Sequence, residues 1–308
     1  MGLIPVAESS KKYPKLGKVA EADSVKLKDK FLNRSRVKIL TLSFDELMSK
    51  TSDFAEFIVF QHWENLYDSK NCPAVYPKLV AEFLANLIIK ENVISSRVQN
   101  TKILLDTEDL GVILGVPSSG ECAYDKIEWP LDCVSQDVAL QYFDPTITGS
   151  SLHVASLSPV HKLLFYFVHH NLVPRLEGRS SPSRAEVAYM YLLANKIPIN
   201  LPGLMLAHLS FIISTSSRKN GIPYAPFFTK IFQSKQIPLD DFHPEEENKI
   251  MDKQGLGNLG LLIKNSKLLP KESAPFSSEQ KPRPTDLLLL LPVIQWWLFL
   301  QLLTTLIF

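Results

Sequence analysis

The chain has 308 residues, with 33 Lys and Arg against 32 Asp and Glu, so its formal net charge is +1. This balance excludes a globally basic nucleic-acid coat, and a hydrophobic fraction of 45% with 21% charged residues excludes a wholly disordered chain. The length predicts one large or two modest domains. Cys72, Cys122 and Cys133 are too few and too widely spaced for a disulfide framework or a zinc site, so we expect a reducing, intracellular compartment.

The first 38 residues carry ten basic and four acidic side chains, a local charge of +6. No apolar stretch long enough for a secretory signal precedes the lysines. We expect residues 1–40 to be disordered, either as a solvated leader or as an arm that contacts nucleic acid or another anionic surface. The basic side chains of this arm are Lys11, Lys12, Lys15, Lys18, Lys26, Lys28, Lys30, Arg34, Arg36 and Lys38.

Helical patterns dominate residues 41–150, the first predicted lobe. Ser43 and Glu46 form an S-x-x-E capping box, which predicts a helix that runs to about Tyr67. Apolar residues then recur at helical spacing over residues 75–90 and give a broad apolar stripe. This second segment is therefore predicted to be a helix that packs against the core.

A small β element interrupts the helices of this lobe. Residues 92–106 contain two short β-branched runs around two central polar residues, which predicts a hairpin. Asp106 or Thr107 can cap a short helix that ends at Gly115. Residues 118–156 lack a clear period and are predicted to be a long connection, with a domain boundary near residue 150.

Residues 151–240 form the second predicted lobe, which is also helical. Pro159 stands at a favoured first helical position, and Ser183 with Glu186 repeats the capping box. The predicted helices of this lobe are 159–171, 184–195, 201–217 and 224–233. Prolines, glycines and a run of three glutamates make residues 241–285 a predicted linker.

Residues 287–308 contain no charged side chain. As a helix this segment would be about 33 Å long, which matches a hydrocarbon core of about 30 Å. It predicts a C-terminal membrane anchor that leaves the folded domain in the cytosol. The alternatives are a core helix of a truncated domain, and an open reading frame that runs past its authentic end. The residues assigned to the membrane under the anchor hypothesis are Leu287, Trp296, Trp297, Phe299 and Phe308.

Catalytic sequence motifs are absent. No P-loop or nucleophile elbow occurs, and the GLGNLG run at residues 255–260 lacks a predicted preceding strand, so we interpret it as a chance match to G-x-G-x-x-G. His161 and His169 are two helical turns apart, and His169 and His170 point to different faces, so the three cannot share a metal. We therefore predict no catalytic, cofactor-binding or metal-binding residues and a protein that is not an enzyme.

Two blocks, residues 76–120 and 157–242, carry four short motifs in a fixed order. The motifs are LGVP at 114–117, LVPR at 172–175, INLP at 199–202 and IPY at 222–224. With these motifs the chain resembles the plant transposon protein domain, a family found in plant open reading frames derived from retroelements. The resemblance implies an origin in a transposable element, without transposase, integrase or reverse transcriptase chemistry.

Three hypotheses about function follow. The leading one is a non-catalytic, gag-like or accessory module whose helical domain self-associates or binds a protein or nucleoprotein, with nucleic acid held by the basic arm. The second is a tail-anchored membrane protein with a cytosolic helical domain, anchored through residues 287–308. The third is a degenerate element relic without a retained function. These hypotheses place the chain in the nucleus or cytoplasm, or at a membrane through its tail.

Overall fold

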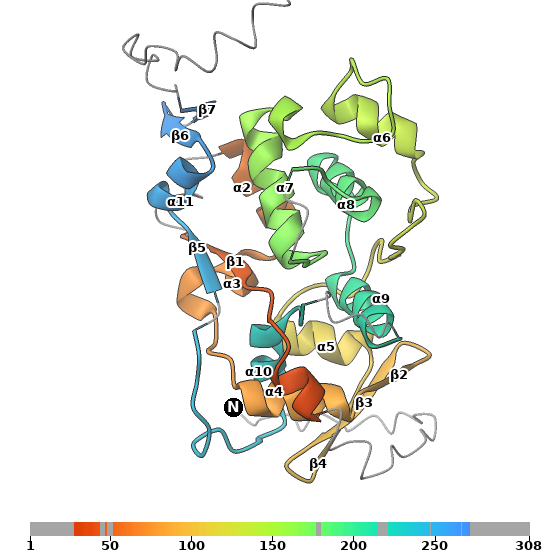
Figure 1. The fold of residues 1–308 in the computed structure, drawn as a ribbon, viewed down its shortest axis with the longest axis vertical. Helices are drawn as coiled ribbons and strands as arrows, with labels where there is room; N and C mark the ends of the chain where they lie inside the picture. The colour runs from red at the N-terminus through yellow and green to blue at the C-terminus, as the bar shows by residue number, and fades with distance from the viewer. Residues whose placement is uncertain are drawn as a thin grey trace, which may run out of the picture. The chain divides into compact units, whose positions relative to one another are not determined.

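Helices make up most of the regular structure in the computed structural model (Figure 1), as the sequence predicts. The model describes residues 28–43, 47, 52–176, 180–214, 221–246, 248–265 and 267–271. Residues 28–32 are helical. The labelled α-helices are α2 (Ser52–Phe60), α3 (Glu64–Tyr67), α4 (Pro77–Ala85), α5 (Thr107–Leu114), α6 (Gln136–Phe143), α7 (Pro159–Asn171), α8 (Arg184–Ala194), α9 (Leu201–Ser214), α10 (Ala225–Ser234) and α11 (Lys253–Asn258).

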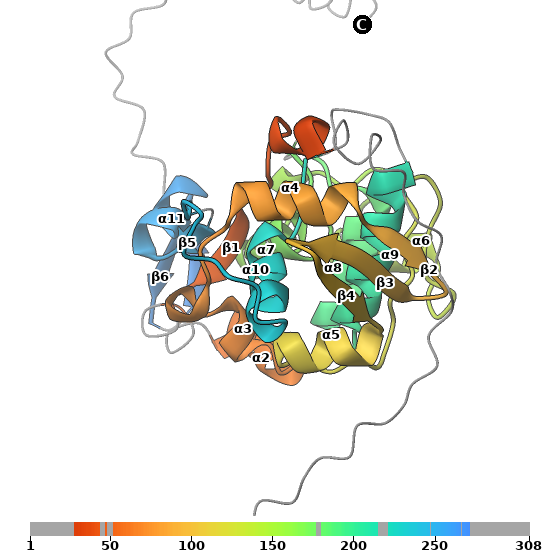
Figure 2. The ribbon, with the colours of Figure 1, turned by 90° about the horizontal axis from the view of Figure 1, so that it is seen from below.

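The strands of the described chain form small sheets. A parallel pair joins β1 and β5, an antiparallel sheet has the order β2-β3-β4, and β6 and β7 form an antiparallel pair. The three-stranded sheet lies at one end of the unit beside α4 and α5 (Figures 1 and 2). The strands are β1 (Ile39–Leu42), β2 (Ile88–Lys90), β3 (Val93–Val98), β4 (Thr101–Leu105), β5 (Asn248–Met251), β6 (Leu261–Lys264) and β7 (Lys267–Pro270).

The prediction of a single helix that runs to Tyr67 is wrong, because two separate helices, α2 and α3, occupy residues 52–67. Glu46 of the capping box lies outside the described residues. Helix α2 ends at Phe60 and α3 begins at Glu64, because His62 takes a φ of 58° and a left-handed residue ends a helix.

The helix predicted over residues 75–90 ends early, at Ala85. Asn86 follows it, and its side-chain amide donates hydrogen bonds to the carbonyls of Glu82 and Arg97. The last part of the predicted helix is strand β2, which pairs with β3. Its two isoleucines fit a strand as well as a helix, so the neighbouring strand decides between them.

The predicted hairpin is confirmed as β3 and β4. Its two central residues, Gln99 (φ 46°) and Asn100 (φ 65°), both take the positive φ that a two-residue type I′ turn requires. The short helix after it is also confirmed as α5. Asp106 caps α5 by accepting a hydrogen bond from the backbone of Asp109 at 2.8 Å, and Gly115 ends it with a φ of 70°.

Residues 118–156 are not only a connection, because they contain α6. The Ser135 side chain caps this helix, and Ala139, Leu140 and Phe143 are buried on its inner face, with α8 as a neighbour. The helix has only two turns, which is too short to produce a clear period in the sequence.

The helices predicted in the second lobe are present as α7 to α10. Pro159 is the first residue of α7, and the box of Ser183 and Glu186 opens α8 with both reciprocal hydrogen bonds. Helix α9 is described as far as Ser214, and residues 215–220 lie outside the described residues. Local chemistry at the first turn is therefore enough to locate the starts of α7 and α8.

Residues 241–285 are a linker in the sequence prediction, but β5, α11, β6 and β7 lie within this range. Strand β5 pairs with β1 from the opposite end of the chain, with Leu40 opposite Lys249. The side-chain amide of Asn171 completes the hydrogen bonding of β1, because it accepts from Leu40 N at 2.8 Å and donates to Leu40 O at 2.9 Å. Residues 272–308 lie outside the described residues.

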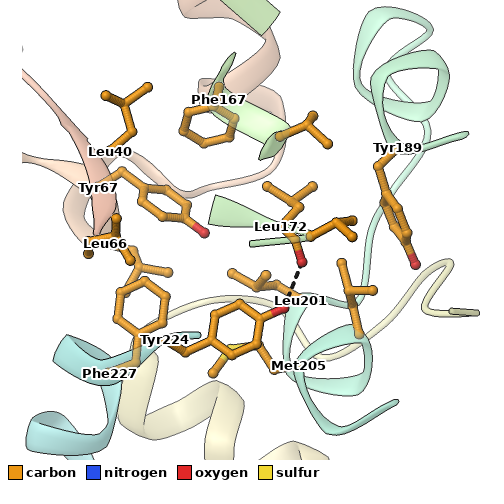
Figure 3. Packing of buried hydrophobic residues seen from close by; sticks show 14 of the residues in the cluster. Leu40, Leu66, Tyr67, Phe167, Leu172, Tyr189, Leu201, Met205, Tyr224 and Phe227 are labelled. Atoms are coloured by element: carbon orange, nitrogen blue, oxygen red, sulfur yellow. Dashed lines mark hydrogen bonds between the residues drawn. The ribbon is translucent and has the colours of Figure 1, made fainter. Parts of the chain in front are cut away.

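The core is built around aromatic side chains from distant parts of the chain (Figure 3). The ring of Tyr67 lies 5.0 Å from that of Phe167 and 5.9 Å from that of Phe227, so α3, α7 and α10 meet there. One hydrophobic cluster contains side chains from both predicted lobes, and residues up to Pro270 belong to one compact unit. The domain limits proposed from the sequence stay predictions.

No helix in the described part of the chain is long and apolar enough to cross a membrane. The predicted membrane residues, from Leu287 to Phe308, lie outside the described residues.

Candidate functional site

The predicted basic arm is partly folded. Lys11, Lys12, Lys15, Lys18 and Lys26 lie outside the described residues, but the other five basic residues lie within them. The arm was predicted to be disordered as far as residue 40, and this is wrong for residues 28–40, which include a helix and the start of β1.

Ion pairs and backbone hydrogen bonds explain why this part of the arm folds. Lys28 Nζ lies 2.9 Å from Glu82 Oε2, and Arg36 Nη2 lies 2.7 Å from Glu245 Oε2. Val37 is buried and donates its backbone N–H to Ile222 O at 2.8 Å. Two arm cations are therefore neutralised by acids of the folded unit.

Lys30 and Lys38 are the exposed cations of the folded part of the arm. Neither makes an ion pair with another described residue. Arg34 differs, because it is buried and desolvation lowers the pKa of its guanidinium. The arm thus contributes two exposed positive charges in the region that the structure describes.

A buried carboxylate, Glu186, is the centre of the most extensive polar cluster in the described core. Its Oε1 accepts hydrogen bonds from His169 Nδ1 at 2.8 Å and Arg175 Nε at 2.9 Å. Its Oε2 accepts from Arg175 Nη2 at 2.6 Å and from the backbone N–H and hydroxyl of Ser183 at 2.6 and 2.8 Å. Helices α7 and α8 and the segment between them are joined through this one group.

The charge balance of this cluster keeps Glu186 ionised. Burial acts to raise the pKa of the carboxyl, but the hydrogen bond from His169 and the positive charge of Arg175 outweigh burial and lower the pKa. Because a carboxylate only accepts hydrogen bonds, His169 carries a proton on Nδ1. His169 Nε2 is buried and has no partner among the described residues.

The Glu186 cluster does not resemble a reactive site. The side chains of Glu186 and His169 are both fully buried, so neither can meet a substrate from solvent in this arrangement. Arg175 is the partly exposed member and closes the cluster on its outer side. The arrangement fits a structural cluster that fixes the turn after α7.

A second buried polar group joins His208, Tyr224 and Leu172. Tyr224 Oη lies 2.7 Å from the carbonyl oxygen of Leu172 (Figure 3) and 2.8 Å from His208 Nδ1. The carbonyl only accepts, so the Tyr224 hydroxyl donates to it and His208 Nδ1 donates to the hydroxyl. Burial lowers the pKa of His208 to about 3, so this imidazole is neutral at physiological pH.

Polar residues of three of the four family-like motifs serve the fold in a similar way. Arg175 of LVPR binds Glu186 and the carbonyl of Ser181. Asn200 of INLP caps α9 by accepting from Gly203 N at 2.8 Å. Tyr224 of IPY binds Leu172 O. The polar groups of these motifs thus bind the protein's own turns and helix ends.

The GLGNLG run differs from the sequence prediction in one respect, because a strand, β5, does precede it. However, Gly255 and Gly257 lie inside the short helix α11 rather than in a loop before it. The carboxylate of Asp252 already accepts from Gly255 N at 2.7 Å at the start of this helix. The run therefore does not form a phosphate-binding loop here.

The thiols and metal-ligating side chains add no reactive group. Cys72, Cys122 and Cys133 are free, and burial raises the pKa of Cys72 to about 11, which disfavours its thiolate at neutral pH. The described residues include no group of three His, Cys, Asp or Glu side chains that could hold a metal ion.

Sequence reasoning missed the Glu186 cluster although parts of it were visible. The capping box identified Glu186 and the LVPR motif contained Arg175, but their contact depends on how the chain returns after α7. Similarly, Asn171 is a polar residue at the end of an apolar helix, which could have been recognised as a site for pairing with backbone.

The fold and these contacts define a helical domain whose motif residues hold its turns in place. The model of the Putative plant retrotransposon-related domain matches residues 59–238, more than half of the chain. The protein therefore belongs to this family, and the resemblance seen in the sequence is confirmed. No curated protein and no solved structure gives a significant match.

Proposed function

We propose that this retrotransposon-derived chain is a non-catalytic, gag-like or accessory module that binds nucleic acid in a nucleoprotein. One observation carries the proposal: the polar residues of the LVPR, INLP and IPY motifs bind the domain's own backbone and a buried carboxylate. A catalytic module would instead be expected to present such groups to a pocket. The exposed cations are then the groups free to contact a partner.

The exposed lysines of the arm support a polyanionic partner. Lys30 and Lys38 carry charges that no described acid neutralises, and the ion pairs of Lys28 and Arg36 hold this part of the arm on the domain. Cations held on a folded surface bind phosphates by releasing counterions, without requiring a particular base sequence. Binding should therefore depend strongly on salt and weakly on sequence.

The test is binding of the full chain to a fluorescently labelled duplex DNA, followed by anisotropy at increasing salt. The proposal predicts binding at about 50 mM salt that weakens steeply towards about 200 mM. A variant with Lys30→Gln and Lys38→Gln should bind more weakly.

A deletion of the arm has to stop at residue 27. A deletion through residue 38 would also remove the contacts of Lys28, Arg36 and Val37 with the folded unit and could destabilise it. The absence of any binding at about 50 mM salt would overturn the proposal, because electrostatic binding is strongest at low salt.

A further inference from the structure

The outer face of the three-stranded sheet carries only basic, apolar and hydroxyl side chains. Strand pairing fixes this face: Ser95 lies opposite Leu104, Arg97 opposite Lys102, Ile88 opposite Ser95 and Lys90 opposite Val93. The other face packs on α4, where Ser96 Oγ donates to the carbonyl of Phe83 at 2.7 Å. Of the residues on this face, named here the sheet face, the three cations are exposed, Val93 is buried and the others are half-buried; the set is Ile88, Lys90, Val93, Ser95, Arg97, Lys102 and Leu104.

Arg97 and Lys102 form the centre of the charge on the sheet face. They are directly opposed in the register, next to the pair that closes the two-residue turn. Such a pair does not exchange hydrogen bonds, and its side chains lie close together. Both residues are exposed, and neither makes an ion pair with any other described residue.

Two like charges directly opposite each other destabilise a sheet. No ion pair with a described carboxylate offsets this repulsion, so we expect the pair to cost some stability in the free protein. A bound anion would remove the cost, because it would neutralise both groups at once.

Lys90 extends the charge along the sheet. It lies opposite Val93, four residues before Arg97 on β3, so the two cations are about 14 Å apart along the strands at about 3.4 Å per residue. Glu91 lies 3.9 Å from Lys90, and both side chains are exposed. The sheet face therefore presents two opposed cations without a described carboxylate partner and a third cation, Lys90, that Glu91 accompanies, spread over about 14 Å.

The folded part of the basic arm and the hairpin turn both contact α4, although the arm lies on the opposite side of α4 from the sheet (Figure 2). Glu82 on α4 accepts from Lys28 Nζ with Oε2 and from the backbone N–H of Gln99, in the hairpin turn, with Oε1, both at 2.9 Å. Figures 1 and 2 show the arm helix and the sheet on either side of α4 at the same end of the unit. One carboxylate thus joins the two basic elements.

From this geometry we infer that the sheet face is a binding surface for the phosphate backbone of nucleic acid, with Arg97 and Lys102 as its central contacts. This inference rests on the proposed function. The face has no aromatic side chain on which a base could stack, so it contacts phosphates and does not select single strands by stacking. Cations spread over about 14 Å fit a polymer with evenly spaced charges better than one small anion.

The test compares the full chain with a variant carrying Arg97→Gln and Lys102→Gln in the duplex DNA assay. Loss of two phosphate contacts should reduce the slope of log affinity against log salt by about 1.8. The affinity of the wild type would then fall about tenfold more than that of the variant between about 50 and 200 mM salt. The melting temperature of the variant should be unchanged or higher, because the repulsion within the pair is removed.

A matched control is available in the second hairpin. Lys264 and Lys267 are also directly opposed, and their strands β6 and β7 lie at the other end of the unit in Figure 1. Lys264→Gln with Lys267→Gln removes the same charge and should leave the salt slope unchanged. An equal loss in the control would show that only net charge matters and would overturn the inference.

The remaining outcomes separate the inference from the proposed function. If the wild type binds DNA and the Arg97 and Lys102 variant binds with the same affinity and slope, the inference is overturned and the proposed function stands. If the wild type does not bind DNA at all, both are overturned. If the variant loses binding only to vesicles of phosphatidylserine and phosphatidylcholine, the face binds a membrane and the inference is wrong.

Discussion

Replacing Glu186 by Gln should cause a large loss of stability. Glutamine has one acceptor oxygen and an NH2 group that donates, but the Arg175 guanidinium and the Ser183 backbone N–H, which bind Glu186, can only donate. Arg175 donates to both oxygens of Glu186, so either orientation of the amide places an N–H group against Arg175, and one orientation also places it against the Ser183 N–H. His169 is fully buried, so solvent supplies no alternative partner for its imidazole.

The size of the effect follows from this burial. Removing one partner of a buried ionic cluster costs about 3–5 kcal/mol. Arg175 is partly exposed and regains some hydration, which places the loss towards the lower end of that range. For a unit of this length each kcal/mol lowers the melting temperature by about 2–4 °C, so the expected shift is about 6–20 °C.

Thermal unfolding followed by circular dichroism at 222 nm measures this shift, because the fold is mainly helical. The control is Glu56→Gln, the same substitution in an exposed ion pair, where Glu56 Oε2 lies 2.8 Å from Lys196 Nζ. That pair should contribute at most about 1 kcal/mol. Equal melting temperatures for the two variants would refute the argument that burial makes the Glu186 cluster stabilising.

Two further predictions concern stability. Burial lowers the pKa of His208 from an ordinary 6.5 to about 3. Between these pH values the unfolded chain binds a proton that the folded chain excludes. The His208 contribution to stability is therefore fully present above pH 6.5, and as the pH falls towards 3 it is lost at up to about 1.4 kcal/mol per pH unit. Denaturant unfolding at a series of pH values should show this loss, and it should become smaller in His208→Gln. Asn171→Leu should cost about 1–3 kcal/mol, because it leaves the buried N–H and C=O of Leu40 without partners, and unchanged urea unfolding would contradict that role.

Local chemistry in the sequence determined where several elements begin and end. Pro159, Ser183 and Asp106 start helices because their side chains or ring satisfy requirements within the first turn. The turn of the β3–β4 hairpin is also local, because two residues with positive φ are enough to reverse the chain. Each of these features depends only on residues a few positions away in the chain, so a short stretch of sequence is enough to predict it.

Tertiary structure decided what each polar group does. The capping box shows Glu186 at a helix start, but only the return of the chain after α7 brings Arg175 and His169 to its other oxygen lone pairs. Strand β1 exists because β5, more than 200 residues later, and Asn171 supply its partners. Alternation along β3 and β4 places Arg97 and Lys102 on one side of the hairpin, yet it does not say which side faces water. Helix α4 decides this, because it covers the opposite face and leaves the cations exposed.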